Sequence, residues 1–312
     1  MAPPLAMIPC PICAHTDAVS FLRGRDHASG EWFELQRCPH CELVFIGSPP
    51  TNLADYYHTS YRQYRPWTHR IFRFLYGRHA RSWSRQLSHK GRALEIGCGE
   101  GWMLAALRSE GWSVVGVERS VASGRFAATE NRLPLLVGGL EAFKPVPTFD
   151  LIFMHHVLEH LPDPLTTLRH SAALLRPGGS LLIVVPNLAS WQFRFARAGW
   201  FHLDVPRHLT HFTPAALRHA LNRVGLRIEN IRFVSIDQDP FGWLVSILNR
   251  LGFPQTRWLH WLAGHERGLT LANLGMLVLS LPLLMLGFFL AALSWLAGAG
   301  ACMEVRAVQG NR

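Results

Sequence analysis

Short apolar runs separated by longer stretches of helical periodicity dominate the middle of the chain. The runs lie at 93–96, 113–117, 133–137, 150–155 and 178–186. Buried strands that alternate with helices are typical of a doubly wound, mostly parallel α/β sheet. Two further segments, 227–235 and 302–308, alternate apolar and polar positions and indicate two more strands. The pattern therefore predicts a seven-stranded sheet whose last two strands lie far apart in the sequence.

The segment between these last two strands, 237–300, is an apolar helical insertion. No Asp, Glu, Lys or Arg occurs between Arg267 and Glu304, and about 20 apolar residues suffice to span a bilayer. One crossing would place the last strand on the wrong side of the membrane, and two crossings need about twice that length. We therefore expect an insertion that enters the membrane and returns, with its helix broken at Pro282. A hairpin buried in a dimer interface, and a C-terminal anchor without a seventh strand, are the alternatives.

Four cysteines near the N-terminus form two matched CxxC pairs. They are Cys10, Cys13, Cys38 and Cys41. Two such pairs complete a tetrahedral zinc site, and the strand-like stretches GEWFELQRC and LVFIG enter and leave the second pair. The pattern predicts a zinc ribbon over 1–47, in which structural Zn²⁺ replaces a core that a unit this small cannot build. Binding of a substrate or partner by the ribbon is the alternative.

The following segment, 48–90, is rich in arginine and aromatic residues. After Pro66 these residues take a helix-like spacing, which predicts an amphipathic helical linker. Such a helix packs on the next domain or contacts anionic lipid headgroups. Tyr56, Tyr57 and Tyr61 are candidates for folding over a ligand.

Overall composition changes this picture in two ways. The chain carries a net charge of +10 and 49% hydrophobic residues, which favours anionic partners such as acidic membrane surfaces, phosphate-bearing substrates or nucleic acid. Its first residues lack the charged start and apolar core of a signal peptide, so we expect a cytoplasmic protein.

A glycine-rich loop follows the first strand of the predicted sheet. The sequence LEIGCGEG places Glu95 two residues before Gly97 and follows a GxGxG spacing, whereas dinucleotide folds use GxGxxG. A carboxylate there disfavours a pyrophosphate and favours a cofactor that carries an ammonium group. Glu118 ends the second strand, where an acidic side chain binds ribose hydroxyls.

Four motifs in order, LEIGCGEG, VVGVE, FDLIFMHHVLEHLPDP and LLRPGGSLLIVVPN, resemble the class I S-adenosylmethionine-dependent methyltransferases, with their Rossmann-like fold. The branch they most resemble contains the ubiquinone-biosynthesis O-methyltransferases. The resemblance covers about half of the chain and implies a methyltransferase domain over 91–236 plus 301–309. It implies that S-adenosylmethionine is bound by Glu95, Gly97, Cys98, Gly99, Gly101, Glu118, Gly139, Leu140, His155, His156 and Val157.

Candidate chemistry gathers after the fourth and fifth strands. HHVLEH brings Glu159 and His160, and DVPRHLTHFTP brings Asp204, Arg207, His208 and His211 toward the same edge of the sheet. Histidine titrates near neutrality, so we predict that His160 or His208 removes the acceptor's proton. The segment PRHLTHFTP resembles an active-site lid of related enzymes, which favours His208. The alternatives are that Glu159 and His160 cap the next helix, that His211 ties a loop, or that carboxylate and histidine bind a metal.

These features together predict an enzyme that methylates an oxygen of a lipid-linked or membrane-partitioned small molecule. We expect it to be associated, peripherally or re-entrantly, with the inner face of the membrane, and the oligomeric state is left open. An RNA methyltransferase that uses its zinc ribbon is the first alternative, disfavoured because an apolar insertion has no use on RNA. A membrane-bound scaffold that binds the cofactor without turnover is the second.

Overall fold

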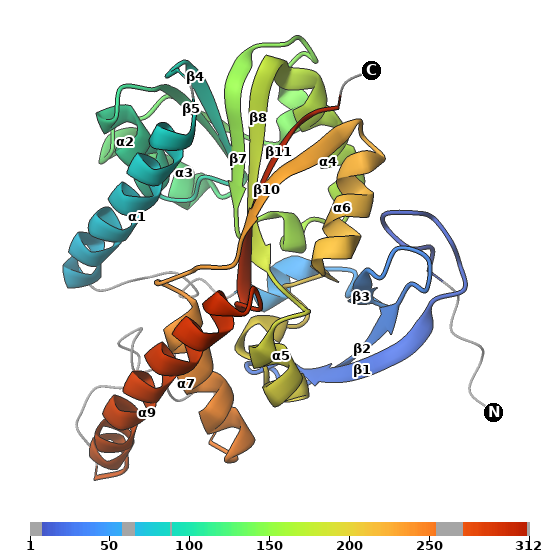
Figure 1. The fold of residues 1–312 in the computed structure, drawn as a ribbon, viewed down its shortest axis with the longest axis vertical. Helices are drawn as coiled ribbons and strands as arrows, with labels where there is room; N and C mark the ends of the chain where they lie inside the picture. The colour runs from blue at the N-terminus through green and yellow to red at the C-terminus, as the bar shows by residue number, and fades with distance from the viewer. Residues whose placement is uncertain (1–7, 58–65, 88, 254–270, 311–312) are drawn as a thin grey trace.

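The computed structural model describes residues 8–57, 66–87, 89–253 and 271–310 (Figure 1). A seven-stranded sheet in the order β10-β11-β8-β7-β4-β5-β6 forms its centre. The strands are β4 (Arg92–Ile96), β5 (Ser113–Glu118), β6 (Leu135–Val137), β7 (Phe149–His155), β8 (Leu175–Pro186), β10 (Leu226–Arg232) and β11 (Cys302–Gln309). All neighbours pair in parallel except β11, which is antiparallel to both β8 and β10. The predicted doubly wound sheet is confirmed.

Helices cover both faces of this sheet. One face carries α1 (Pro66–Gln86), α2 (Trp102–Ser109) and α3 (Val121–Thr129), and the other carries α4 (Pro164–Leu174) and α6 (Pro214–Asn222) (Figure 1). Because side chains alternate along a strand, Leu151 and Phe153 pack with α2 while Ile152 and Met154 pack with α4 and α6. Both sides of β7 are buried, which explains why its sequence is continuously apolar.

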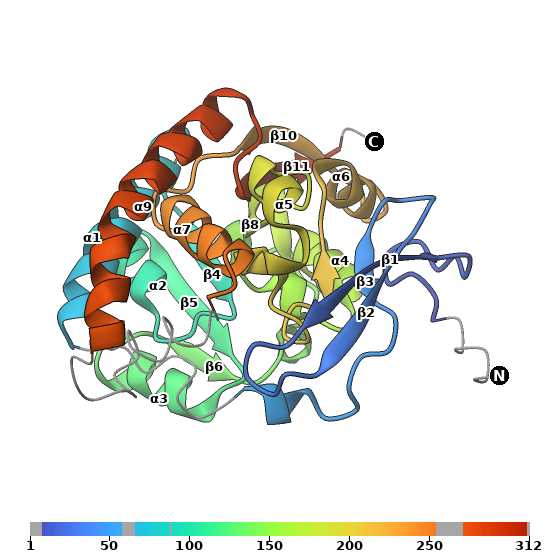
Figure 2. The ribbon, with the colours of Figure 1, turned by 90° about the horizontal axis from the view of Figure 1, so that it is seen from below.

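The last strand is separated from β10 by the insertion, as its alternating sequence predicts. The described part of the insertion holds α7 (Asp239–Arg250) and α9 (Leu271–Leu296), which lie side by side and extend away from the sheet (Figures 1 and 2). Strand β11 then re-enters between β8 and β10, with Val305 opposite Ile183. A C-terminal anchor without a seventh strand is therefore excluded.

The predicted break at Pro282 is wrong, because α9 continues through this proline. Pro282 lies on the exposed side of α9, away from α7, so its ring meets solvent and not the neighbouring helix. One missing backbone hydrogen bond is tolerated within a 26-residue helix of otherwise favourable residues. Within the described residues, no helix combines the length and the hydropathy that crossing a bilayer requires.

The N-terminal region forms a second, four-stranded sheet. It consists of β1 (Val19–Arg25), β2 (Trp32–Arg37), β3 (Val44–Ile46) and β9 (Thr210–His211), in that order. The first three strands are the ribbon, and β2 and β3 match the two strands predicted around the second cysteine pair. The fourth strand comes from the segment PRHLTHFTP, where Val44 pairs with His211. The ribbon is thus completed by a strand from the C-terminal half of the chain.

Candidate functional site

The glycine loop between β4 and α2 has the left-handed backbone that its sequence requires. The φ angles are 70° at Gly97, 52° at Gly99 and 78° at Gly101. A Cβ atom at Gly97 would lie 2.6 Å from Val157 Cγ2, and one at Gly101 would lie 2.3 Å from Leu133 Cδ1. Larger residues would therefore be both strained and obstructed. The loop brings its backbone close to the end of β7, where the resemblance places the sulfonium.

Two carboxyl side chains flank this loop and differ in their hydrogen bonding. Glu118 Oε2 accepts a hydrogen bond of 2.7 Å from the Gly99 backbone N–H, and its Oε1 accepts one of 2.8 Å from that of Ser120. Glu95 is buried, and its Oε2 has no hydrogen-bond partner. Burial, reinforced by the charge of Glu118, raises the pKa of Glu95 well above its ordinary value. A buried carboxyl group with an unsatisfied oxygen fits the ammonium of S-adenosylmethionine, because that cation would satisfy it.

The remaining residues predicted to bind the cofactor lie within the loop and directly after β6. Cys98 is buried, and burial raises the pKa of its thiol, which keeps the side chain neutral. Gly139 and Leu140 follow β6, and Leu140 is buried at the start of a single 3-10 turn. Both therefore lie near the carboxyl ends of β4 and β5, where a doubly wound sheet binds its ligand.

The end of β7 is the most strained part of the site. His156 has a φ of 55°, which is uncommon for a residue with a Cβ and clusters at functional positions. Its Nδ1 lies 3.1 Å from Glu159 Oε1. The other atoms of this pair, His156 Nε2 and Glu159 Oε2, are buried without a hydrogen-bond partner. The ring of His155 instead contacts α1, with centroids 5.8 Å from both Tyr76 and His79.

Glu159 is ionised in this setting. Burial alone would raise its pKa, but the hydrogen bond and charge of His156, with further charges from His160 and His208, lower it to about 2. A carboxylate bonded to one nitrogen of an imidazole fixes the ring's orientation and supports a proton on it. Sequence reasoning placed His156 beside the cofactor but missed its pairing with Glu159, although the i,i+3 spacing in HHVLE was the available signal.

The two histidines predicted as catalytic lie together. Their ring centroids are 4.6 Å apart. His160 Nδ1 lies 3.0 Å from the Tyr57 hydroxyl and 2.9 Å from the Arg207 carbonyl oxygen. His208 Nδ1 lies 2.8 Å from the His202 carbonyl oxygen, and burial lowers its pKa to about 4. Their catalytic role stays a prediction. Tyr61, another aromatic candidate for covering a ligand, lies outside the described residues.

The structure distinguishes among the alternative roles that the sequence left open for Glu159, His160 and His211. Glu159 and His160 do not cap α4, because Asp163 does, accepting a 2.9 Å hydrogen bond from the Thr166 N–H. His211 does tie a loop, with its Nε2 lying 2.8 Å from the Leu203 carbonyl oxygen. One ligand atom each from Glu159, His160 and His208 falls within 4.8 Å of the others, a grouping that a metal ion could occupy.

Arg207 anchors the ribbon and does not lie open to a ligand. Its guanidinium Nη2 lies 2.8 Å from Asp26 Oδ1 in the ribbon and 2.6 Å from Asp204 Oδ1. Sequence reasoning placed Asp204 and Arg207 above the active edge but missed Asp26. The sequence carried no signal for it, because a partner 181 residues away is fixed only by the tertiary fold.

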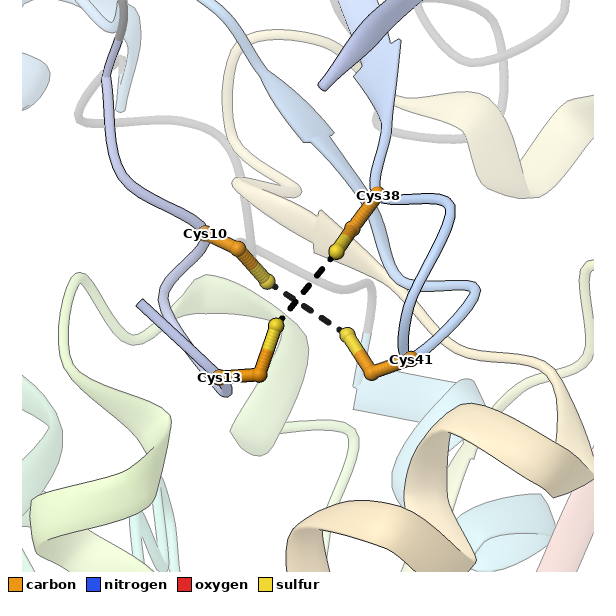
Figure 3. A group of neighbouring side chains, drawn as sticks. All are labelled: Cys10, Cys13, Cys38 and Cys41. Carbon is orange, nitrogen blue, oxygen red and sulfur yellow. Dashed lines mark hydrogen bonds between the residues drawn. The ribbon is translucent and has the colours of Figure 1, made fainter. Parts of the chain in front are cut away.

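The four cysteines of the ribbon converge as predicted (Figure 3). Cys10 Sγ lies 3.4 Å from Cys41 Sγ, and Cys13 Sγ lies 3.4 Å from Cys38 Sγ. All four sulfur atoms lie within 4.8 Å of one another. A tetrahedral zinc ion with Zn–S bonds of about 2.3 Å would space its sulfur ligands about 3.8 Å apart. The cluster therefore fits structural Zn²⁺, held by these four thiolates.

Comparisons with known proteins agree on one kind of domain. The methyltransferase domain family matches residues 58–231, more than half of the chain. The chain is 30% identical over 115 residues to the ubiquinone biosynthesis O-methyltransferase of Vibrio parahaemolyticus, covering 35% of this chain and 49% of that protein. It is 40% identical over 114 residues to the tRNA U34 carboxymethyltransferase of Pseudoalteromonas translucida, covering 32% and 35%.

The match to these relatives is confined to part of their length. The chain spans about half of the Vibrio protein, and its ribbon and insertion lie largely outside the family match. Among solved structures, a SAM-dependent methyltransferase from Archaeoglobus fulgidus has a TM-score of 0.47 at 18% identity, covering 75% of this chain and 93% of that one.

Proposed function

The chain belongs to the class I S-adenosylmethionine-dependent methyltransferases, and on that premise we propose that it methylates an oxygen of a lipid-linked or membrane-partitioned small molecule. The observation that carries this proposal is the outward face of α9, described below. The name of the Vibrio parahaemolyticus relative, an O-methyltransferase, supports oxygen as the acceptor atom.

The cofactor would be held by the glycine loop, Glu95 and Glu118. S-adenosylmethionine supplies an electrophilic methyl group on a sulfonium. The chain's own residues have three tasks around it. Glu95 would hold the ammonium with the oxygen that now has no hydrogen-bond partner, and the left-handed glycines would let the backbone approach the cofactor. The residues at the end of β7 would position the acceptor.

The acceptor's hydroxyl needs a base, and His156 has the geometry for it. Its Nδ1 contacts ionised Glu159, and its Nε2 is buried with no hydrogen-bond partner. We assign proton removal to His156 Nε2, with Glu159 supporting the proton that the ring gains. His160 and His208, the bases predicted from the sequence, have their Nδ1 atoms within hydrogen-bond distance of backbone carbonyl oxygens.

Helix α9 has the reverse of the pattern expected for a water-soluble helix. Small residues lie buried on its inner side, namely Ser280, Gly287, Ala291 and Ser294. Gly287 approaches α7 so closely that a Cβ there would lie 2.5 Å from the Pro240 carbonyl oxygen. Large apolar residues lie on the exposed side, and we call these the α9 face: Val278, Leu281, Met285, Phe288, Phe289 and Leu296.

The side chains of the α9 face recur at three- and four-residue spacing, so they share one stripe of the helix. Their exposed fractions run from 47% at Phe288 to 87% at Leu296. Small residues toward a neighbouring helix and bulky apolar residues outward are typical of helices that meet lipid. A net charge of +10 matches an anionic bilayer.

The α9 face is joined directly to the catalytic sheet, because α9 leads within a few residues into β11. A bilayer that contacts this face would hold the enzyme beside the compartment where an apolar acceptor dissolves. None of the chain's six cysteines forms a disulfide, which fits a reducing compartment, so we place this contact at the inner, cytoplasmic face of the membrane.

The deciding experiment incubates the purified protein with radiolabelled S-adenosylmethionine and separated lipid, RNA and soluble fractions of cell extract. We expect the label in the lipid fraction. In parallel, flotation with vesicles of anionic phospholipid compares the wild type with Leu281→Ser/Phe289→Ser. The matched control is Val19→Ser/Val146→Ser, which removes two side chains that are 56% and 57% exposed elsewhere.

We expect the α9 variant to lose vesicle binding and labelling of lipid, and the control to keep both. Label in a soluble product with no vesicle binding would contradict the proposal. A wild type that is dimeric by light scattering, and an α9 variant that is monomeric, would instead make this face a subunit interface.

Transfer to RNA is the second candidate. It is favoured by the chain's positive charge and by its 40% identity over 114 residues to a tRNA-modifying enzyme. Label in the RNA fraction, with binding that weakens steeply as salt rises, would establish it.

A further inference from the structure

Three side chains from distant parts of the sequence converge beside the end of β7, outside the glycine loop and the cysteine cluster. They are His79 of α1, His155 at the last position of β7, and Asp237 in the loop after β10. One nitrogen or oxygen atom from each lies within 4.8 Å of the others. His79 Nε2 lies 3.5 Å from Asp237 Oδ1, and the two imidazole rings are 5.8 Å apart at 68°.

We infer that His79, His155 and Asp237 form a second metal site, which binds a divalent transition ion of the zinc type. Two imidazoles and one carboxylate suit Zn²⁺ and its first-row neighbours, whereas Mg²⁺ and Ca²⁺ prefer oxygen ligands throughout. Three protein ligands leave at least one coordination position open, in contrast to the closed set of four cysteines in the ribbon.

The surroundings of the three ligands support this inference. The Ser235 hydroxyl donates a 2.9 Å hydrogen bond to Asp237 Oδ1, which orients the carboxylate in the way that outer-shell partners orient metal ligands. The side chains of His79 and Asp237 are only 20% and 10% exposed, so the site is shielded yet reachable.

A cavity of about 150 Å³ opens beside the cluster and gives an ion a way in. His79 and Asp237 line it together with Arg78, Arg232 and Glu304. The two guanidinium groups balance the two carboxylates, so the cavity has no net formal charge before an ion enters. A bound dication would bring a net positive charge, which favours an anionic or water ligand at its open position. The ion would also join α1 to the last residue of β7, directly before His156.

The test counts metal in the full-length protein. The purified chain is saturated with Zn²⁺, passed through gel filtration and analysed by elemental mass spectrometry. We expect about two zinc ions per wild-type chain, one of them in the ribbon. His79→Gln and Asp237→Asn should each retain one. His89→Gln is the matched control, because His89 also pairs with a carboxylate, Asp150 at 3.2 Å, but belongs to none of the possible metal-binding groups among the described residues. That variant should keep both ions.

Cobalt supplies an independent readout that does not depend on activity. Co²⁺ bound by the cysteines gives intense near-ultraviolet bands from the thiolates, whereas Co²⁺ bound by two histidines and a carboxylate gives only weaker visible bands. The second equivalent should add visible bands without thiolate bands, and both site variants should lack this addition. A single equivalent in the wild type would overturn the inference. So would a second equivalent that survives both substitutions, since the ion would then lie elsewhere, for example at Glu159, His160 and His208.

Discussion

Arg207 Nη2 lies 2.8 Å from Asp26 Oδ1, and the two side chains are 0% and 1% exposed. This buried ion pair joins the zinc ribbon to the segment that supplies β9. A charge buried this deeply requires a partner, and Arg207 has two, because its Nη2 also lies 2.6 Å from Asp204 Oδ1. The ribbon is therefore fixed to the catalytic sheet by electrostatics as well as by backbone pairing.

The first prediction concerns this pair. Asp26→Asn should lower the free energy of unfolding by about 1.5–3 kcal/mol, because the Arg207 guanidinium loses its charged hydrogen bond to the ribbon while it keeps Asp204. Chemical denaturation monitored by circular dichroism measures the change. The control is Glu42→Gln, whose carboxylate meets Arg37 at 3.6 Å with both side chains nearly half exposed. That change should cost less than about 1 kcal/mol, and an equal loss in both variants would show that burial is not the cause.

The second prediction concerns the glycine loop. Gly101→Ala should weaken S-adenosylmethionine binding at least about tenfold, because its Cβ would meet Leu133 Cδ1 at 2.3 Å and displace the loop. Isothermal titration calorimetry measures the affinity. Gly178→Ala separates strain from obstruction, since Gly178 has nearly the same φ of 79° but nothing within 4 Å of the added atom. If both variants bind the cofactor like the wild type, the loop does not cradle it.

The third prediction concerns acid stability. Burial, followed by the charge of His208, lowers the pKa of His211 to about 4, against opposing effects of the Leu203 carbonyl and the carboxylates Glu159 and Asp204. The folded state therefore keeps the ring neutral, while the unfolded chain takes up a proton near pH 6.5. Stability from this group is complete above pH 6.5 and falls as the pH drops toward about 4.

His211→Gln removes that titration. At pH 7.5 the variant should unfold at a lower temperature than the wild type, because glutamine packs less well beside Leu203. The difference should shrink toward pH 5, where the wild type alone loses stability through this ring. Melting temperatures of both proteins across this range give the result, and a difference that stays constant with pH would refute the argument.

Much of the fold could be predicted from local pattern. The strands of the central sheet are continuous apolar runs, because both of their faces are buried, and the cysteine pairs specify their own geometry. Strand β11 was predictable from seven alternating residues together with the resemblance to class I methyltransferases, which implies a last strand between β8 and β10.

Other features depend on contacts that the sequence does not encode locally. Strand β9 has two residues, and its pairing with β3 spans more than 160 positions. The continuity of α9 through Pro282 follows from the exposed position of its ring, which is set by packing on α7. The pairing of His156 with Glu159 was missed although its i,i+3 spacing is local. The sequence does not show that His156 takes the left-handed φ at which its ring meets Glu159.

The fourth prediction tests that pair. His156→Gln should lower turnover about 10²–10⁴-fold, because the base is lost while the glycine loop is untouched. The affinity for S-adenosylmethionine, measured by calorimetry, should stay within about threefold of the wild type. Glu159→Gln should lower turnover less, because its amide still orients the ring but no longer stabilises a proton on it. Turnover is measured with the labelled fraction that accepts the methyl group.

Two comparisons make this outcome specific to His156. His170→Gln alters another partly buried histidine, whose Nε2 lies 3.0 Å from the Phe143 carbonyl oxygen on α4's side of the sheet, and should leave turnover unchanged. Added imidazole should restore part of the activity of His156→Ala, which a purely structural role would not allow. If His160→Gln or His208→Gln abolishes turnover while His156→Gln does not, the base is one of the two histidines that the sequence alone favours.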